Sequence, residues 1–363
     1  MKRAIVVSIG VLILAAAPSA VTAQGGYKAP RNMYGQPDFE GAWTNATITP
    51  QTRPAQFGDR AVLTPQEVKR LEGTAAQTVE AGNRNTDPNT PPPTSGADVG
   101  GYNRGWLDPG SLVMRVGGQP RSALLTTPDG QVPVNLQGQR VGQGPQRNVA
   151  LGEAQTPAQQ AQAAQAARAA AGGRGGQFDN PEQRPLGERC LVSFGRNGGP
   201  PMFPNGFYNN NYQFAQNKDE VTITVEMVHD VRHIRLGDRQ HPPASVRPWF
   251  GDSFGWWEGD TLVVETTNIP QRQAYMGSWR NLKVTERFKR VAKDRMLYQF
   301  TIDDPTIWAK PWGGEYEFAD LHGELHEYAC HEGNYALEGI LAGARAEEAT
   351  AAGKQAAVVK SNR

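Results

Sequence analysis

Three titratable side chains stand at the ends of expected strands, where a barrel would open. His229 follows the alternating segment 220–227, and His331 and Glu332 follow the expected last strand at 325–330. Histidine changes charge near neutral pH, so a histidine held at a barrel mouth can work as an acid or a base. We expect His229 and His331 to act as base and acid, with Glu332 as an orienting carboxylate. A hydrogen-bonded structural role is the alternative for each histidine.

Glu286 is the other carboxylate that could orient the base, because strand parity turns it toward the core. It alternates with Leu282, Val284 and Phe288, and every second side chain of a strand lies on the same face. Burying a carboxylate costs free energy unless it is paired or takes up a proton. The pattern leaves two hypotheses open, a functional acid and a salt bridge with an inward-facing arginine.

His229 and His233 look like a metal-binding pair, but a strand would hold them apart. Four residues of strand separate them by about 13 Å, at about 3.3 Å per residue. They could bind one zinc ion only if a bulge brought them together. We therefore expect no metal site at this pair, and the metal content of the protein is left open. The leading hypothesis also involves no organic cofactor.

Asp252 and three aromatic residues complete the candidate site. The segment 251–253 is typical of a loop, where Asp252 would be a second acid or would bond nearby backbone in a turn. We expect Tyr212, Trp256 and Tyr335 to shape a pocket for a small, partly apolar molecule. Packing at the base of a hairpin is the alternative for the tryptophan.

Motifs and charge exclude several classes of function. The chain has no Gly-x-Ser-x-Gly elbow, phosphate-binding loop, dinucleotide-binding fingerprint or zinc-ligand spacing, which disfavours nucleotide enzymes and hydrolases of those types. Without Lys2 and Arg3 the chain carries 35 basic and 36 acidic side chains, a formal net charge of −1. This balance gives no electrostatic reason to expect nucleic acid as a partner. The oligomeric state is left open.

Residues 1–23 have the features of a secretory signal peptide. Two basic residues precede the apolar run 4–17, and the small residues 21–23 end at an expected cleavage site before Gln24. The apolar run is shorter than the roughly 20 residues needed to span a bilayer. No later stretch is long and apolar enough for a membrane helix. We expect a periplasmic or secreted protein.

The two cysteines, Cys190 and Cys330, are expected to form a disulfide in an oxidising compartment. Closing so long a loop would stabilise the fold by roughly 4 to 5 kcal/mol in the chain-entropy model. A reactive, unpaired thiol is the alternative, because sequence does not fix pairing.

The region 179–345 is expected to fold as the main antiparallel barrel. The cleanest alternation is in 220–227, with valine, isoleucine and methionine on one face and threonine and glutamate on the other. Regularly spaced strands with tight turns indicate an all-β protein, an antiparallel meander closed into a lipocalin-like β-barrel with few short helices. Further strands are expected at 230–236, 261–267, 282–290, 296–302, 315–319 and 325–330.

The rest of the mature chain divides into three parts. Residues 24–142 contribute a first strand around Trp43, loops and a helix that begins with a capping box at Thr64. Residues 143–178 are rich in Ala, Gln and Gly and lack the large apolar side chains that would offset the entropy of ordering, so we expect a mobile insertion. Residues 346–363 are expected to be a solvated tail.

A set of motifs runs through the chain and is specific as a set. It comprises PDFEGAW (37–43), YNNNYQ (208–213), EMVHDVR (226–232), GDS (251–253), WEGDTLVV (257–264), ERF (286–288) and YACHEGNY (328–335). In these motifs the chain resembles a family of exported bacterial proteins with a lipocalin-like barrel appearance. It departs from that family in the insertion and at Gly237-Asp238, where the family has Asp-Gly. The resemblance implies export and a single β domain, and it brings no established reaction.

These observations favour a secreted, cofactor-independent enzyme that works by acid/base catalysis at the barrel mouth. It would be a lyase, isomerase or hydrolase acting on a small, partly apolar molecule. The alternative is a lipocalin-like small-ligand binding protein without catalysis. Titratable groups converging within about 4 to 6 Å in an open pocket would favour catalysis, and a sealed apolar pocket would favour binding. A third hypothesis is an envelope-associated interaction protein that uses the insertion.

Overall fold

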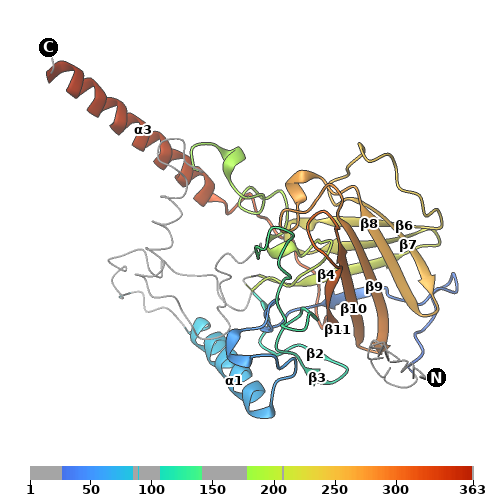
Figure 1. Ribbon diagram of the computed structural model, residues 1–363. Helices are drawn as coiled ribbons and strands as arrows, with labels where there is room; N and C mark the ends of the chain where they lie inside the picture. Colours follow the sequence, from blue (N-terminus) through green and yellow to red (C-terminus); the bar gives the residue numbers. More distant parts are fainter. Residues whose placement is uncertain (1–26, 85–88, 90–106, 141–177, 207, 362–363) are drawn as a thin grey trace, which may run out of the picture.

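A computed structural model gives the fold of residues 27–84, 89, 107–140, 178–206 and 208–361 (Figure 1). The expected signal peptide, and the expected insertion up to residue 177, lie outside these ranges.

Nine strands close into a barrel, which confirms the expected all-β fold (Figure 1). Their order is β1-β11-β10-β9-β8-β7-β6-β5-β4, and β4 pairs in turn with β1. From β4 to β11 each strand lies beside the next in sequence, so β1 closes a meander. The strands are β1 (Gly41–Thr44), β4 (Asn211–Gln216), β5 (Glu220–Val225), β6 (Val231–Leu236), β7 (Asp252–Glu258), β8 (Thr261–Thr267), β9 (Lys283–Ala292), β10 (Arg295–Asp303) and β11 (Trp312–Asp320). A separate small sheet pairs β2 (Arg115–Val116) with β3 (Gln119–Pro120).

One strand pair departs from the expected antiparallel meander. β6 and β7 run parallel, with Ile234 opposite Ser253. The connection 237–251 carries the chain back along the barrel before β7 begins, and parallel neighbours need such a crossover. The prediction of a loop around Asp252 is also wrong, because β7 begins at that residue and pairs with β8 from there onward.

A further prediction fails near the C-terminus. Residues 325–330 form no strand, because β11 already lies between β10 and β1 in the closed barrel. The tail, which was expected to be solvated, is helical up to Ser361 as part of α3 (Tyr335–Ser361), a helix that projects away from the barrel (Figure 1). Its alanine-rich composition has a high intrinsic helix propensity, which favours the helix. The described side chains of residues 346–352 are exposed.

The barrel interior holds a buried ion pair. The side chains of Arg232 on β6 and Glu286 on β9 are 1% and 0% exposed. Arg232 Nη1 donates to Glu286 Oε1 at 2.9 Å, and the Tyr298 hydroxyl donates to the same oxygen at 2.8 Å. Burial and the neighbouring Glu286 charge raise the pKa of Tyr298 well above its ordinary value, so this hydroxyl stays protonated. The rings around Tyr298 are those of Phe288, Phe300, Tyr316 and Phe318.

The N-terminal strand ties the start of the described chain to the barrel. Trp43 on β1 is 3% exposed, and its Nε1 donates to the Phe39 carbonyl at 3.0 Å. The Arg290 guanidinium lies 5.3 Å from the Trp43 ring centroid and also donates to the Asp38 carbonyl. β1 is therefore held by packing as well as by its two strand neighbours.

Helix α1 (Pro65–Gly82) begins with the predicted capping box. The Glu67 amide donates to Thr64 Oγ1, and the Thr64 amide donates to the Glu67 carboxylate at 2.8 Å. Its buried side chains Val68, Leu71 and Ala75 form a second core with Ile48, Phe57, Leu63 and Val113. None of the helices in the described ranges has the length and hydropathy to cross a membrane. The short 3-10 helices are η1 (Ala55–Phe57), η4 (Pro181–Gln183), η5 (Phe194–Arg196), η6 (Met227–His229) and η7 (Gln271–Gln273).

Candidate functional site

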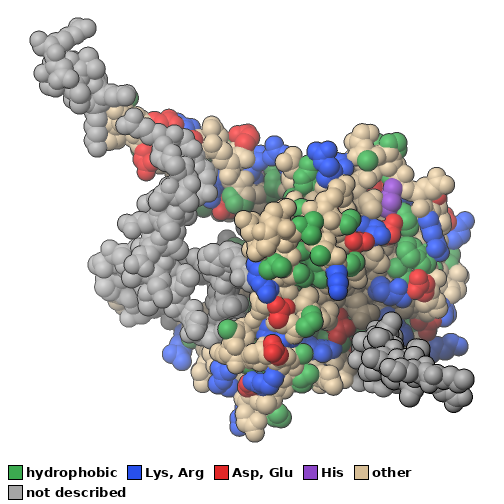
Figure 2. Space-filling view, viewed as in Figure 1, with side chains coloured by type: hydrophobic (Ala, Val, Ile, Leu, Met, Phe, Trp, Pro, Cys, Tyr) green, Lys and Arg blue, Asp and Glu red, His purple; other side chains and the backbone are tan. Residues whose placement is uncertain are grey.

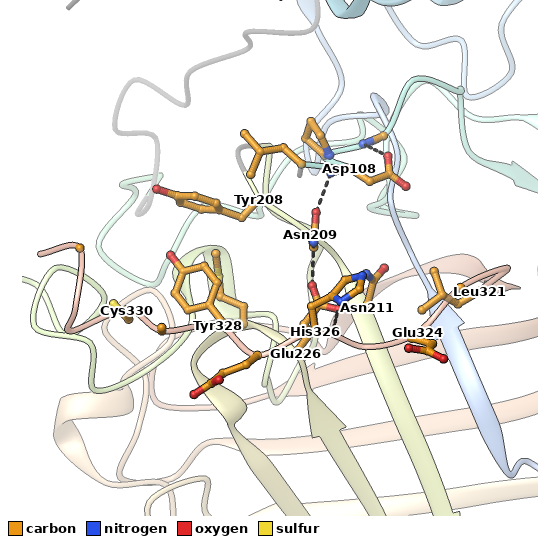
Figure 3. A pocket seen from close by; sticks show the side chains of 18 of the residues that line it. Asp108, Tyr208, Asn209, Asn211, Glu226, Leu321, Glu324, His326, Tyr328 and Cys330 are labelled. Atoms are coloured by element: carbon orange, nitrogen blue, oxygen red, sulfur yellow. Dashed lines mark hydrogen bonds between the residues drawn. The ribbon is translucent and has the colours of Figure 1, made fainter. Parts of the chain in front are cut away.

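A cleft of about 1190 Å³ opens at the end of the barrel where β4 begins and β5 ends (Figure 3). We call it the rim cleft. Its walls come mainly from residues within 107–111, 208–211, 226–227 and 321–336. Segments far apart in sequence therefore meet at this rim of the barrel.

The side chains of three consecutive asparagines, residues 209–211, point to alternate sides of the backbone where β4 begins. Asn209 and Asn211 donate from their Nδ2 atoms to the carboxylate of Glu226, at 2.7 and 3.1 Å (Figure 3). Asn210 points the other way and accepts from Asn197 Nδ2 at 2.9 Å in a buried amide network. Successive side chains of an extended chain alternate sides, so one run of residues supplies both the cleft and the interior.

Glu226 forms part of the floor of the rim cleft and is 6% exposed. Besides the two asparagine amides, its carboxylate accepts the backbone N–H of His326 at 3.0 Å. Three N–H donors offset the cost of burying a carboxylate. Among the ion pairs of the described residues none involves Glu226, so its negative charge has no cationic partner there.

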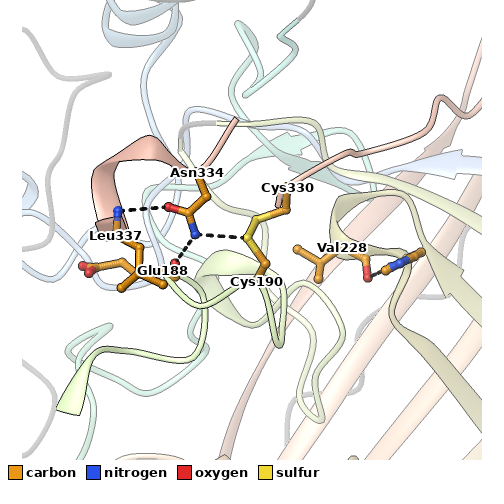
Figure 4. The surroundings of a disulfide bond; sticks show 7 residues. Glu188, Cys190, Val228, Cys330, Asn334 and Leu337 are labelled. Atoms are coloured by element: carbon orange, nitrogen blue, oxygen red, sulfur yellow. Dashed lines mark hydrogen bonds between the residues drawn. A yellow bond between two sulfur atoms is a disulfide. The ribbon is translucent and has the colours of Figure 1, made fainter. Parts of the chain in front are cut away.

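The disulfide between Cys190 and Cys330 is present, as expected, with 5.7 Å between the two Cα atoms (Figure 4). Asn334 lies beside it: its Nδ2 donates to the Glu188 carbonyl at 2.7 Å and to Cys190 Sγ at 3.4 Å. Its Oδ1 accepts the Leu337 amide and so caps the start of α3. The disulfide and this cap fix the segment that walls the rim cleft.

A smaller hollow of about 330 Å³ adjoins the rim cleft, and we call it the side hollow. The two share Glu226 and the segment 326–330. His229, His331 and Glu332 all line the side hollow, so the structure brings together three of the five predicted catalytic residues. Their catalytic role stays a prediction.

His229 does not lie on a strand, which corrects the geometry assumed for it. β5 ends at Val225, and the η6 turn follows, with positive φ angles of 59° at Val228 and 46° at His229. The turn leaves His229 exposed, with its Nδ1 against the Val228 carbonyl. His233 lies on β6, where its Nδ1 pairs with Glu220 of β5 at 2.5 Å. The two histidines therefore have separate partners.

Asp230 is a buried acid directly after the turn. It is 8% exposed, and its Oδ2 accepts the Ser193 amide at 2.8 Å. Burial raises the pKa of the Asp230 carboxyl to about 6, against the hydrogen bonds from Ser193 and the nearby His229, which lower it. This carboxyl changes charge close to neutral pH beside a histidine of the side hollow.

The other two predicted acids lie elsewhere. Glu286 is enclosed in the barrel with Arg232, which is the salt bridge considered as the alternative to a functional acid. Asp252, at the start of β7, accepts from Arg235 at 2.8 and 3.0 Å and contacts His241 Nδ1 at 2.6 Å. Neither acid lines the rim cleft or the side hollow.

The three aromatic residues expected to shape the pocket are also dispersed. Tyr212 is fully buried in the barrel, where its hydroxyl accepts from Asn197 at 3.1 Å. Trp256 on β7 donates to Glu258 and lies 4.6 Å below the Arg239 guanidinium. Tyr335 begins α3 and is 78% exposed. None of them is among the residues that line the cleft.

The residues that build the rim cleft were not among the site residues predicted from the sequence. The aromatic pair in its wall is Tyr208 and Tyr328, whose ring centroids are 5.5 Å apart in a T-shaped contact. Two signals could have found the site: a run of amides before a strand, and Glu226 at the end of the alternating strand that follows. Both place polar side chains at the same barrel rim.

Within the described ranges, no group of three or more His, Cys, Asp or Glu side chains is arranged to hold a metal ion. Comparisons with protein-family models, with curated proteins and with solved structures found no match to this chain.

Proposed function

We propose that this chain is an exported protein that binds a small molecule in the rim cleft. The observation that carries the proposal is the hydrogen-bonded floor of the cleft. There the buried Glu226 carboxylate accepts from the side-chain amides of Asn209 and Asn211 and from the His326 backbone N–H. Pockets for small ligands combine an open volume with a few precisely placed polar groups. The volume of about 1190 Å³ suits a molecule of drug size.

The barrel interior is a poorer candidate for the ligand, because protein side chains fill it. Tyr298, Tyr316, Phe288 and Phe318 are all fully buried there around the Arg232 ion pair. Small barrels commonly pack their interiors with side chains in this way. We therefore expect the barrel to serve as the scaffold and the ligand to bind at its rim.

Native mass spectrometry of protein purified from a bacterial periplasm tests the proposal. We expect a chain that begins at Gln24 and carries a small molecule that is lost on denaturation. Ala336 is an exposed residue of the cleft lining, so Ala336→Trp should fill the cleft and abolish the bound mass. Ala346→Trp, on an exposed part of the same helix outside the lining, is the matched control and should keep it. Equal ligand content in both variants would place the ligand elsewhere and refute the proposal.

Acid/base catalysis at the side hollow is the second candidate function. The observation that favours it is Asp230, with its pKa raised to about 6 by burial, next to a hollow lined by His229 and His331. Acids and bases that titrate near the working pH are the most effective proton donors and acceptors. Incubating the released ligand with fresh protein, and with His331→Gln, would test it by mass spectrometry. Conversion by the wild type alone would support catalysis, and an unchanged ligand would leave binding as the function.

A further inference from the structure

Acidic side chains outnumber basic ones in the rim cleft. Among the described residues that line it there is no lysine or arginine, and Asp108, Glu226, Glu324 and Glu327 contribute carboxylates. The carboxylate of Glu188 also lines the cleft but is paired with Arg184, and the lining includes the imidazoles of His322 and His326. In the view of Figure 2, by contrast, basic and acidic side chains are interspersed over the face of the barrel. The cleft therefore presents a local negative field that favours a cation over an anion.

The floor also offers an acceptor that has no donor. Asn211 is 6% exposed, and its amide nitrogen donates to Glu226, but its Oδ1 is buried and has no hydrogen-bond partner among the described residues. A buried polar atom left unpaired costs free energy, and a donor supplied at the cleft floor would remove that cost. The carboxylate of Glu226 beside it is an acceptor too. Both groups would accept hydrogen bonds from N–H or O–H donors of a ligand.

The lining of the rim cleft also supplies aromatic surface. Tyr208 and Tyr328 pack edge to face with ring centroids 5.5 Å apart, and both line the cleft. Phenol rings attract cations to their faces and pack against apolar groups. An ammonium or guanidinium group joined to an aromatic or apolar part would match both features of the cleft.

We propose that the rim cleft selects a small organic cation, an amine or guanidinium compound with an aromatic or apolar portion. This inference rests on the proposed function and specifies its ligand class. Exposed Glu324 and Glu327 would attract the cation, and Glu226 with Asn211 would accept its hydrogen bonds.

Titration calorimetry of the whole mature protein with three probes tests the charge preference. Tyramine, 4-ethylphenol and 3-(4-hydroxyphenyl)propionate share a phenol and differ in carrying a positive, no or a negative charge. We expect tyramine to bind at least about tenfold more tightly than the other two, with an affinity that falls as salt is added, because salt screens exposed charges. Equal or tighter binding of the neutral or anionic probe would overturn the inference, as would binding of none of them.

Exposed acids allow a test that does not disturb the fold. The double variant Glu324→Gln with Glu327→Gln should weaken tyramine binding by roughly threefold to tenfold, in line with exposed charge pairs. The matched control, Asp59→Asn with Asp294→Asn, removes two exposed acids outside the lining and should leave the affinity unchanged. Equal losses in the two double variants would show a general charge effect and overturn the inference. The native-mass comparison of Ala336→Trp is independent of ligand charge, so its result separates failure of this inference from failure of the proposed function.

Discussion

At the floor of the rim cleft, three N–H groups converge on the carboxylate of Glu226, and each belongs to a different position of the chain. The side chain thus links the start of β4, the end of β5 and the segment that follows β11. Its role is positional, because its hydrogen bonds hold Asn209, Asn211 and the His326 backbone in place.

Glu226→Ala should leave three donors without their acceptor. We expect the free energy of unfolding to fall by about 1 to 3 kcal/mol, the cost of unsatisfied buried polar groups. Hydrogen exchange of the His326 amide should become faster, because its acceptor is gone. Glu220→Ala is the control: among the described residues the side chain of this β5 acid pairs with the exposed His233 alone, so the change should cost no more than about 1 kcal/mol. An unchanged exchange rate at His326 would contradict the role given to Glu226.

Asp230 gives a prediction in pH. Its folded pKa of about 6 lies above its ordinary value of 3.8, so the protonated form favours folding. The stabilisation is complete below about pH 4 and is lost as the pH rises through 6, amounting to ~3 kcal/mol at most. Urea unfolding of Asp230→Asn between pH 4 and 7.5 should therefore show the variant gaining stability relative to the wild type as pH rises. The exposed Asp294→Asn should track the wild type, and parallel curves for Asp230→Asn would contradict the raised pKa.

At the scale of elements, the segment from Leu321 to Asn334 has no strand or helix of its own, yet it walls the cleft. It is held at both ends, by the Leu321 amide on the Ala42 carbonyl and by the disulfide with its asparagine cap. Between them it is held by the Glu226 contact. Cross-links thus replace regular pairing in this part of the barrel rim.

Replacing both cysteines, Cys190→Ser with Cys330→Ser, should lower the free energy of unfolding by about 4 to 5 kcal/mol in the chain-entropy model, because the bond closes a loop with a sequence separation of 140. The change should also free the cleft wall locally. Chemical denaturation measures the first effect, and hydrogen exchange across 321–334 measures the second. A large loss of stability with unchanged exchange in this segment would show that the disulfide does not hold the cleft wall.

Elements with a repeating pattern were predictable from the sequence, and those set by long-range contacts were not. The strict alternation in β5 and the turn residues around β8 to β10 are local patterns, and they were enough to predict those strands. The capping box of α1 likewise depends on residues within one turn. The crossover before β7 and the course of 325–330 depend on which strand edges are already occupied, and no local pattern encodes that. For the same reason, parity placed Glu286 inside the barrel, but the rim cleft, built from distant segments, was not foreseen.

For the whole molecule, the barrel is a scaffold whose apolar and aromatic interior encloses an ion pair. Arg232 and Glu286 are both enclosed and bonded to each other, and Tyr298 completes the carboxylate's partners. Removing one member of such a pair leaves an unpaired buried charge, whereas replacing both by apolar groups does not. The pair therefore tests how the barrel interior is stabilised, separately from the rim.

Arg232→Met should destabilise the fold by about 3 to 5 kcal/mol, because Glu286 would be left buried without its cation. The double variant Arg232→Met with Glu286→Leu should recover much of that loss. Thermal and denaturant unfolding of both variants measure the difference. The exposed pair of Arg287 and Glu258 is the control, and its disruption should cost at most about 1 kcal/mol. A double variant less stable than the single one would contradict this view of the interior.

We propose that the ligand occupies the rim of the barrel, and a crystal structure of the protein purified from the periplasm with its native ligand would locate it. We expect a small molecule in the rim cleft, against Tyr208 and Tyr328 and with a donor directed at Glu226 or Asn211. A ligand inside the barrel beside Arg232, or at another surface with the rim cleft empty, would contradict it.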